Sequence, residues 1–382
     1  MKIGFSTSVI QRGKTGVAQY VFALLRAMLP HADQHEFNLF IFEEDLPLFA
    51  FAQGKMKFIT VAERFRPAVK NVLWHQIELP KLAKELRLDV LHVPSYRRML
   101  WRAACPLVAT IHDLAPFHIT GKYDWKRMLY GRIIVKRLAR RQDQIIAVSE
   151  NTARDLATFF GLACDRVNVV WNGIDHQRFQ PGEVRAAKKS AAEKWQLSGP
   201  FFLFVSRLEH PGKNHIRLIK AFNQFKANTQ SDWLLALGGS DWHGAEAIYA
   251  AAKNSPYAGD IRFLGFVSDA ALPQLYHATD VFIYPSLFEG FGFPPIEAMA
   301  SGVPVISSTR GSLREVVANA ARTIDPENIA DIAGALASMS GNAEERDRWR
   351  QQGFINARRF DWDANAAQTL AIYEKAIRRG KG

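Results

Sequence analysis

The sequence contains little that would place the protein in an oxidising compartment or across a membrane. Its only cysteines are Cys105 and Cys164, and they form neither a CxxC pair nor a disulfide framework. No stretch of about 18 apolar residues is present, so no transmembrane helix is expected. The opening residues "MKIGFSTSV" lack the long apolar run and cleavage site of a signal peptide. We therefore expect a cytoplasmic protein.

Several catalytic and cofactor motifs are also missing. The chain has no GxGxxG, no GxxxxGK[ST] and no GxSxG after a strand, which are the motifs of dinucleotide-binding folds, P-loops and hydrolases. "HADQH" has two histidines at i, i+4 but is not HExxH. "DWD" at 361–363 imitates a metal-binding DxD, but it follows no predicted strand, and we interpret it as a helix start. We expect no metal and no cofactor.

Acidic residues are scarce in the first half of the chain. The formal net charge is +12, with 29 Lys+Arg against 17 Asp+Glu in residues 1–190 and 20 of each in residues 191–382. The excess is densest from Arg97 to Arg141. A basic half predicts an anionic partner, and nucleic acid and an anionic membrane are both candidates. No RRM, zinc-finger or helix-turn-helix pattern accompanies the charge, so a nucleic-acid-binding protein is the alternative class and we expect no nucleic acid.

Apolar runs alternate with segments of helical spacing along the whole chain. The runs are "KIGFS", "FNLFIF", "KFITV", "DVLHV", "LVATI", "QIIAV", "VNVVW", "FFLFVS", "WLLALGG", "IRFLG", "VFIYPS", "VPVIS" and "RTI". They hardly alternate in polarity, which is typical of strands buried on both faces of a parallel sheet. This order predicts an α/β protein with two doubly wound domains. We place the first at 1–180 and the second at 195–362, joined by the polar stretch that contains Asn172-Gly173 and Pro181-Gly182.

Polar residues follow most of the predicted strands. Ligands of open α/β sheets bind at the carboxyl ends of strands, so we expect a ligand between the two domains. After "VFIY" comes "PSLFEGFGFPPIEAMASG", which we interpret as a loop with Glu289, Gly290 and Gly292, then a helix whose first turn contains Glu297. Two carboxylates and the free N–H groups of the helix start match a phosphorylated polyol such as a nucleotide sugar. The simpler interpretation makes Glu289 a helix cap and Glu297 a surface charge.

This stretch resembles the EX7E motif of retaining glycosyltransferases with the GT-B fold, specifically family GT4. Further segments fall in family order over nearly the full length: "RGKTGVAQYVFALLRAM", "VATIHDL", "AVSENTARDL", "VVWNGID", "VSRLEHPGKN", "IRFLGFVSD" and "GVPVISSTRGSLREV". The resemblance implies two Rossmann-like domains facing across a cleft. The first takes the acceptor and is completed by a C-terminal helix at 363–382, and the second binds the nucleotide sugar.

The resemblance also implies roles for individual residues. Arg207 and Lys213 should hold the donor diphosphate and stabilise the leaving phosphate, Glu289 should face the hydroxyls of the donor sugar, and His112 should approach the transferred sugar. On its own, His112 could equally be a hydrogen-bonded histidine near the sheet. The other expected donor-binding residues are Gly16, Phe266, Val267, Gly290, Phe291, Gly292 and Glu297, with Glu297 on the ribose and Phe266 and Val267 at the base.

The sequence departs from the family pattern at three places. Gly16 is followed by Val17 and Ala18 where the family often has a second glycine and a basic residue, which affects the acceptor side. "EHPGKN" replaces the commoner E-P-R-K-N, so one supporting arginine is missing while Lys213 remains. Arg314 stands where proline is usual.

The family chemistry would be transfer with retention and without a metal. The leaving diphosphate takes the proton of the acceptor on the same face, while the protein positions the groups and stabilises charge. We expect GDP-mannose as the donor, with UDP-glucose, UDP-GlcNAc and dTDP-sugars open. The acceptor would be lipid-linked or an oligosaccharide, in the synthesis of a cell-surface polysaccharide. A sugar-nucleotide sensor without catalysis is a third class, which turnover of a labelled donor would exclude.

The segment from Tyr123 to Arg141 has helical spacing, with basic and aromatic residues around an apolar stripe. The predicted stripe is Leu129, Ile133, Ile134 and Leu138. We expect the stripe to pack at least in part on the sheet of the first domain, as a crossover helix must, while the basic residues dock this domain on an anionic leaflet. We expect peripheral binding to the cytoplasmic face of the inner membrane.

Overall fold

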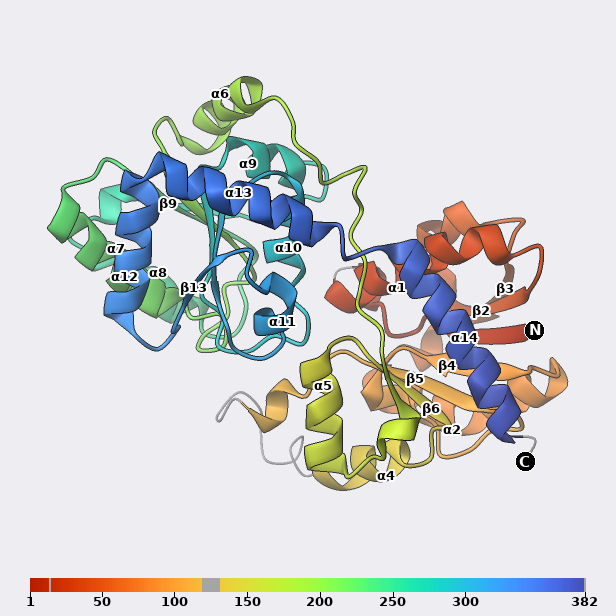
Figure 1. Cartoon of the computed structure of the whole chain (residues 1–382). Helices are drawn as coiled ribbons and strands as arrows, with labels where there is room; N and C mark the ends of the chain where they lie inside the picture. Colours follow the sequence, from red (N-terminus) through yellow and green to blue (C-terminus); the bar gives the residue numbers. More distant parts are fainter. Residues whose placement is uncertain (14, 119–130, 381–382) are drawn as a thin grey trace. The chain divides into compact units, whose positions relative to one another are not determined.

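The computed structural model describes residues 1–13, 15–118 and 131–380, and Figure 1 shows the order of its elements. The chain folds into two compact units, one formed by Met1–Gly173 with Asp361–Gly382 and the other by Ile174–Phe360. Each unit contains one parallel sheet. The predicted α/β class with two doubly wound sheets is therefore confirmed.

The sheet of the first unit has seven strands in the order β3-β2-β1-β4-β5-β6-β7. Their bounds are β1 Lys2–Ser6, β2 Glu36–Phe42, β3 Lys57–Val61, β4 Val90–Val93, β5 Leu107–Ile111, β6 Gln144–Ala147 and β7 Val167–Val169. The described α-helices of this unit are α1 Gly16–Met28, α2 Ala68–Glu85, α4 Lys136–Ala139, α5 Glu150–Asp155 and α14 Trp362–Gly380. All seven strands coincide with the apolar runs of the sequence.

The sheet of the second unit has six strands in the order β10-β9-β8-β11-β12-β13. They are β8 Phe201–Val205, β9 Leu234–Gly238, β10 Ile261–Gly265, β11 Val281–Tyr284, β12 Val305–Ser308 and β13 Arg322–Ile324. The helices are α6 Val184–Trp195, α7 His215–Thr229, α8 Ala245–Lys253, α9 Leu272–Ala278, α10 Phe293–Ala300, α11 Leu313–Val317, α12 Ile329–Gly341 and α13 Ala343–Ala357. The helices pack in groups, α7 with α8 and α12, α10 with α11 and α13, and α6 with α9.

The boundary between the units differs from the sequence interpretation. It lies at Gly173, and the polar stretch that we treated as a link contains α6, which packs on α9 inside the second unit. Alanines on one face explain this packing, because Ala187 and Ala191 are the buried residues of α6 and lie one helical turn apart. At the other end, Asp361 starts α14 as predicted, since its Oδ1 accepts the N–H of Ala364 at 2.7 Å.

The C-terminal helix α14 is joined to the first unit by a buried polar network. Tyr373 Oη lies 2.7 Å from His92 Nδ1, His92 Nε2 lies 2.8 Å from Thr110 Oγ1, and that hydroxyl lies 3.0 Å from Tyr20 Oη. Burial lowers the pKa of His92 to about 3, so the ring is neutral and offers one donor and one acceptor nitrogen to two hydroxyls. The two tyrosines belong to α1 and α14, which lie side by side (Figure 1).

No helix in the described part of the chain is long and apolar enough to cross a membrane.

Replacing Tyr373 by Phe is expected to destabilise the first unit by about 1–3 kcal/mol, because a buried imidazole nitrogen loses its partner. The measurement is thermal unfolding of the full chain, with Tyr249→Phe as the matched control, since the Tyr249 hydroxyl bonds Asp241 at the surface. Equal melting temperatures for the two variants would contradict the role of the network.

Candidate active site

The candidate site of the second unit lies where two neighbouring strands end. β8 and β11 pair in parallel, although β9 and β10 separate them in the chain, so this is the switch point of the sheet, where crevices form. Lys213 lies in the loop after β8 and Glu289 in the loop after β11. The two loops are joined at Gly212, whose carbonyl accepts the N–H of Leu287 at 3.0 Å.

Lys213 and Glu289 form an ion pair with mostly buried side chains. Lys213 Nζ lies 2.6 Å from Glu289 Oε1, and the side chains are 15% and 14% exposed. The same oxygen accepts Ser286 Oγ at 2.6 Å and Tyr284 Oη at 3.0 Å. Oε1 thus has three donors, whereas Oε2 has no hydrogen bond to any residue that the structure describes.

The environment of Glu289 favours the charged carboxylate. Burial alone would raise its pKa, but the Lys213 ammonium and the hydroxyls of Ser286 and Tyr284 outweigh burial, so the pKa of Glu289 is lowered. An ionised carboxylate with one occupied oxygen and one open oxygen can accept hydrogen bonds from hydroxyl groups of a ligand through Oε2.

The loop of Glu289 is fixed by a close contact with the loop after β12. Gly311 has φ +63°, and a Cβ at this position would lie 2.6 Å from the carbonyl oxygen of Glu289. Ser312 donates to that oxygen from its N–H at 3.1 Å and from its Oγ at 3.0 Å. The carboxylate is therefore held by backbone that has little freedom to move.

Free backbone donors lie next to the carboxylate. The N–H groups of Gly290, Phe291 and Gly292 have no acceptor among the residues that the structure describes. Gly292 has φ +100° and stands directly before α10, whose first turn contains prolines. Such donors at a helix start favour an anion. This loop therefore combines an ionised carboxylate with free backbone N–H groups, and the binding of an anion there stays a prediction.

Glu297 lies farther along α10 than we predicted. It is the fifth residue of the helix, so it is not in the first turn and gains little from the free N–H groups there. Its Oε2 accepts the hydroxyl of Tyr276 at 2.9 Å. Burial raises the pKa of Glu297 to about 7, against the lowering effects of Tyr276 and Arg178. The two glutamates therefore have pKa values shifted in opposite directions.

Arg207 is held apart from the ion pair by its own contacts. Its side chain is 50% exposed, its Nη2 lies 3.3 Å from Glu209 Oε2, and its guanidinium lies 4.8 Å from the ring centroid of Trp242. The charge of Arg207 acts on Tyr284, where it opposes a rise of the pKa that burial causes. The structure thus places two cations at this edge, one paired with Glu289 and one stacked on an indole.

Phe266 and Val267, which we expect at the nucleotide base of the donor, flank the end of β9. Phe266 is 75% exposed, and a Cβ on Gly238 would lie 3.1 Å from Val267 Cγ2. Gly239 allows the close approach of two chain segments, because its Cβ would overlap the carbonyl of Ser206. Contact of Phe266 and Val267 with a ligand base stays a prediction.

In the first unit, His112 follows β5. Its Nε2 lies 3.2 Å from the carbonyl oxygen of Pro94, and its ring meets Tyr20 edge-on at 4.7 Å. Burial lowers the pKa of His112 to about 4, with Asp113 opposing, so the ring is neutral near pH 7. Gly16 is the first residue of α1, and a Cβ there would meet nothing within 4 Å. Their predicted roles toward a sugar or phosphate stay predictions.

Four direct partners of the site were missed by the sequence interpretation. Tyr284 and Ser286 end the run "VFIYPS" just before Glu289, so their spacing was a signal that we did not use. Tyr276 and Trp242 reach the site from α9 and from the loop after β9, and their sequence positions give no sign of these contacts.

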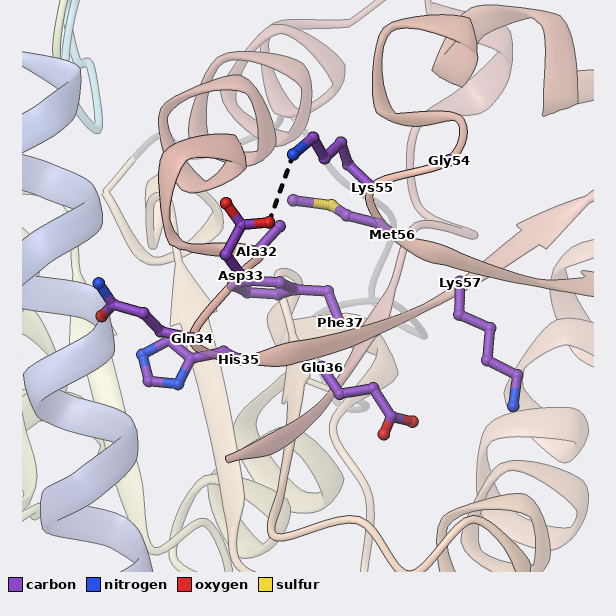
Figure 2. A pocket seen from close by; sticks show the side chains of 10 residues that line it. All are labelled: Ala32, Asp33, Gln34, His35, Glu36, Phe37, Gly54, Lys55, Met56 and Lys57. Carbon is purple, nitrogen blue, oxygen red and sulfur yellow. Dashed lines mark hydrogen bonds and ion pairs between the residues drawn. The ribbon is translucent and has the colours of Figure 1, made fainter.

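A hollow of about 490 Å³ elsewhere in the first unit has different properties. It lies at the amino ends of β2 and β3, and Figure 2 shows the exposed ion pair of Asp33 and Lys55 at its rim. Ligands of open sheets bind at the opposite, carboxyl ends, so this hollow is not a candidate site. The described residues contain no group of three or more His, Cys, Asp or Glu side chains that could hold a metal ion.

Two family models match the chain, one in each half. "Glycosyl transferases group 1" matches residues 186–355, and "Glycosyltransferase Family 4" matches residues 14–178. Together they include the candidate site and most of both units.

Named relatives are similar over most of the chain. The O-antigen chain mannosyltransferase B of Escherichia coli is 26% identical over 98% of this chain and 100% of its own length. The MMP alpha-(1->4)-mannosyltransferase of Mycolicibacterium hassiacum is 31% identical over 72% of this chain and 66% of its own length. The crystal structure of Anabaena HepE in complex with UDP-glucose has a TM-score of 0.77 at 20% identity, covering 98% of this chain and all of that one. This last likeness shows the fold, which is GT-B.

The raised pKa of Glu297 predicts how stability changes with pH. Its pKa is about 7 in the folded chain and 4.5 ordinarily. Between these pH values the folded state therefore binds more protons than the unfolded state. The contribution of Glu297 to the free energy of unfolding falls as the pH rises through this range. Replacing Glu297 by Gln removes the effect. We expect the melting temperature of the variant minus that of the parent to increase from pH 5 to pH 8. A constant difference across this range would contradict the assignment.

Proposed function

This chain belongs to the glycosyltransferases of group 1 and family 4, and we propose that it is a retaining hexosyltransferase that needs no metal. In this proposal it moves mannose from GDP-mannose to a lipid-linked or oligosaccharide acceptor during the synthesis of a cell-surface polysaccharide. The observation that carries the proposal is the Lys213–Glu289 pair with open backbone donors beside it.

The donor diphosphate would lie against the N–H groups of residues 290–292, with Lys213 and Arg207 supplying positive charge. The sugar hydroxyls would donate to Glu289 Oε2, which is the open oxygen of that carboxylate. Glu297, next to Tyr276, would accept the ribose hydroxyls once it loses its proton. The two glutamates then recognise two different parts of one donor molecule.

The reaction balances without a protein nucleophile. The bond between the anomeric carbon and the diphosphate oxygen breaks, and a bond from the acceptor oxygen forms on the same face. The proton of the acceptor hydroxyl passes to the departing phosphate oxygen. Lys213 and Arg207 stabilise the charge that develops on the leaving group, in the manner of an oxyanion hole, and His112 would lie beside the transferred sugar as a neutral ring.

Mannose is our choice because two named relatives are mannosyltransferases. UDP-glucose is the alternative donor, since that nucleotide sugar is bound in the HepE structure. The acceptor is proposed as lipid-linked because the first unit presents an apolar and basic surface.

This surface includes a stripe on α2 that the sequence interpretation missed. Val69, Leu73 and Ile77 recur every four residues on one side of the helix, and all three are exposed, Val69 by 73%. Exposed Trp101 adjoins the stripe, because its N–H donates to the side chain of Gln76 at 3.0 Å. Amphipathic helices with this exposure lie in membrane interfaces.

Basic residues lie near Trp101, beside the α2 stripe. Arg141 lies over the ring of Trp101 at 5.1 Å, and Arg97 and Arg98 begin the same loop as Trp101. We propose that this surface binds an anionic lipid leaflet, and therefore that the protein is peripheral on the cytoplasmic face of the inner membrane. Charge of this kind contributes about 1 kcal/mol per basic residue near a lipid surface.

Only part of the predicted stripe at 123–141 lies in the described residues. Residues 119–130, with Leu129, lie outside the described part. In the described part Leu138 is buried in the core, whereas Ile133 and Ile134 are exposed. Residues 131–135 form a π-helix that leads into α4, and the described part of the stripe has one buried member and two exposed ones, which fits partial packing on the sheet.

The proposed donor is tested by thermal shift with nucleotides and nucleotide sugars, in the presence of EDTA. GDP-mannose at 100 times its dissociation constant should add about 2.7 kcal/mol of stability, and turnover of the labelled sugar should persist in the chelator. A response to UDP-sugars alone would transfer the proposal to the alternative donor. Activity that EDTA abolishes and Mg²⁺ restores would contradict the metal-free chemistry.

Replacing Arg207 or Lys213 by Ala should each lower turnover by about 10²–10³, because one charge-assisted contact to the leaving group is lost. The Lys213 variant should also unfold more easily than the Arg207 variant, since it leaves the buried Glu289 unpaired. The measurement is single-turnover transfer, with Lys253→Ala as the control for an exposed lysine at the end of α8. Near-normal turnover in both variants would exclude this role.

Vesicles of anionic lipid should sediment the protein at low salt and release it at high salt, whereas neutral vesicles should not hold it. Replacing Leu73 and Trp101 by Gln should weaken this binding, and Ile355→Gln, an exposed residue on α13, should not. Equal recovery in the supernatant with both lipid types would favour a soluble acceptor.

A further inference from the structure

A second cavity of the second unit lies away from the proposed donor site. It measures about 500 Å³ and opens between α6, α9, α13 and the loop after α10. Asp280 and Val303 on its wall precede β11 and β12, whereas Glu289 follows β11. The cavity is therefore at the amino edge of the sheet, and we call it the α6–α13 cavity.

The lining of the α6–α13 cavity is basic. Lys188, His277, Arg346 and Arg350 face it, together with the acidic Asp280. Lys188 Nζ lies 2.7 Å from Asp280 Oδ1. Among the described residues of the wall, Asp280 is the only carboxylate, and Asp347, which is outside the wall, pairs with Arg350 Nη1. Lys188 and the two arginines therefore have two carboxylate partners.

Arg346 and Arg350 are held by hydrogen bonds, but each guanidinium keeps N–H donors that have no partner among the described residues. Arg346 Nη1 donates to the carbonyl of Met339 at 2.6 Å and to that of Ser340 at 3.0 Å. Arg350 Nε donates to the carbonyl of Gly302 at 3.0 Å, and its Nη1 donates to Asp347 Oδ1. Nη2 of each guanidinium has no acceptor among the residues that the structure describes. Anchored guanidinium groups with spare N–H donors suit the oxygen atoms of a phosphate.

The side-chain hydroxyl of Ser301, on the same wall, lacks a hydrogen-bond partner among the described residues. The residue is 5% exposed. Buried polar side chains are nearly always hydrogen-bonded, so an exception at a cavity wall indicates a missing partner. An oxygen atom of a ligand in the cavity would supply it.

We propose that the α6–α13 cavity binds a small phosphorylated metabolite. Its phosphate would contact Arg346, Arg350 and Lys188, and a polar group would reach Ser301. A volume of about 500 Å³ exceeds what a phosphate ion fills and is within the range of small-molecule pockets. The ligand therefore carries an organic part, such as a sugar.

The cavity is connected to Glu297 by two short paths. Tyr276 lines the cavity, and its hydroxyl donates to Glu297 Oε2 at 2.9 Å. The N–H of Ser301 donates to the carbonyl of Glu297 at 3.0 Å. Through these contacts, occupation of the cavity would change donor affinity, and the donor would then change the affinity of the cavity by the same factor. This regulatory part rests on the proposed function, whereas binding in the cavity does not.

The test is isothermal titration of the full chain in phosphate-free buffer with glucose 6-phosphate, and separately with inorganic phosphate. One series contains saturating GDP or UDP, which blocks the donor site. A second series without nucleotide measures binding in the cavity even if the donor assignment is wrong. We expect saturable binding of the sugar phosphate, tighter than that of inorganic phosphate. Binding of neither probe, or equal binding of both, would overturn the proposed ligand class.

Three variants locate the binding. Ser301→Ala should weaken it up to about tenfold, because the hydrogen bond to the polar group of the ligand is lost, without lowering the melting temperature. Lys188→Gln and Arg350→Gln should weaken it further, and Lys253→Gln should leave it unchanged. Unchanged affinity in Ser301→Ala and Lys188→Gln would place the ligand elsewhere. Donor affinity should shift at least about fivefold with the cavity occupied, and an unaltered donor affinity would overturn the regulatory part.

Discussion

The ion pair between Lys213 and Glu289 is the interaction on which the proposed donor site depends. A buried carboxylate is costly unless a charge and hydrogen bonds compensate for lost water. Here Lys213, Ser286 and Tyr284 all donate to one oxygen, which keeps the carboxylate ionised and leaves the other oxygen open. Lys213 neutralises Glu289, and in the proposed donor site it would also supply positive charge to the diphosphate.

The fold brings this pair together from distant parts of the chain. β8 and β11 are neighbours in the sheet, so the loops after them meet at one edge, and the Gly212 carbonyl joins them. A third loop at Gly311 supports the backbone of Glu289. These contacts leave the carboxylate few positions, which is the preorganisation that charge stabilisation in a transition state requires.

Much of the fold and part of the site were predictable from sequence. Buried parallel strands leave an apolar signal, and every strand coincided with such a run. The Glu289 loop was readable because its glycines precede prolines that can start a helix. Local spacing could not place Tyr276 or Trp242, which depend on helix packing, nor the raised pKa of Glu297, which depends on burial. The stripe on α2 was missed because exposed and buried apolar residues look alike in a sequence.

A double-mutant cycle on Lys213→Met and Glu289→Gln, read as affinity for the nucleotide sugar, tests the central claim most directly. If Lys213 acts largely by keeping Glu289 ionised and in place, the double variant should bind the donor no more weakly than the Lys213 variant alone. The interaction free energy should then lie within about 0.5–3 kcal/mol. If the losses of binding free energy in the two single variants sum to that of the double variant within about 0.5 kcal/mol, the two side chains act independently. That result would contradict the account of the donor site.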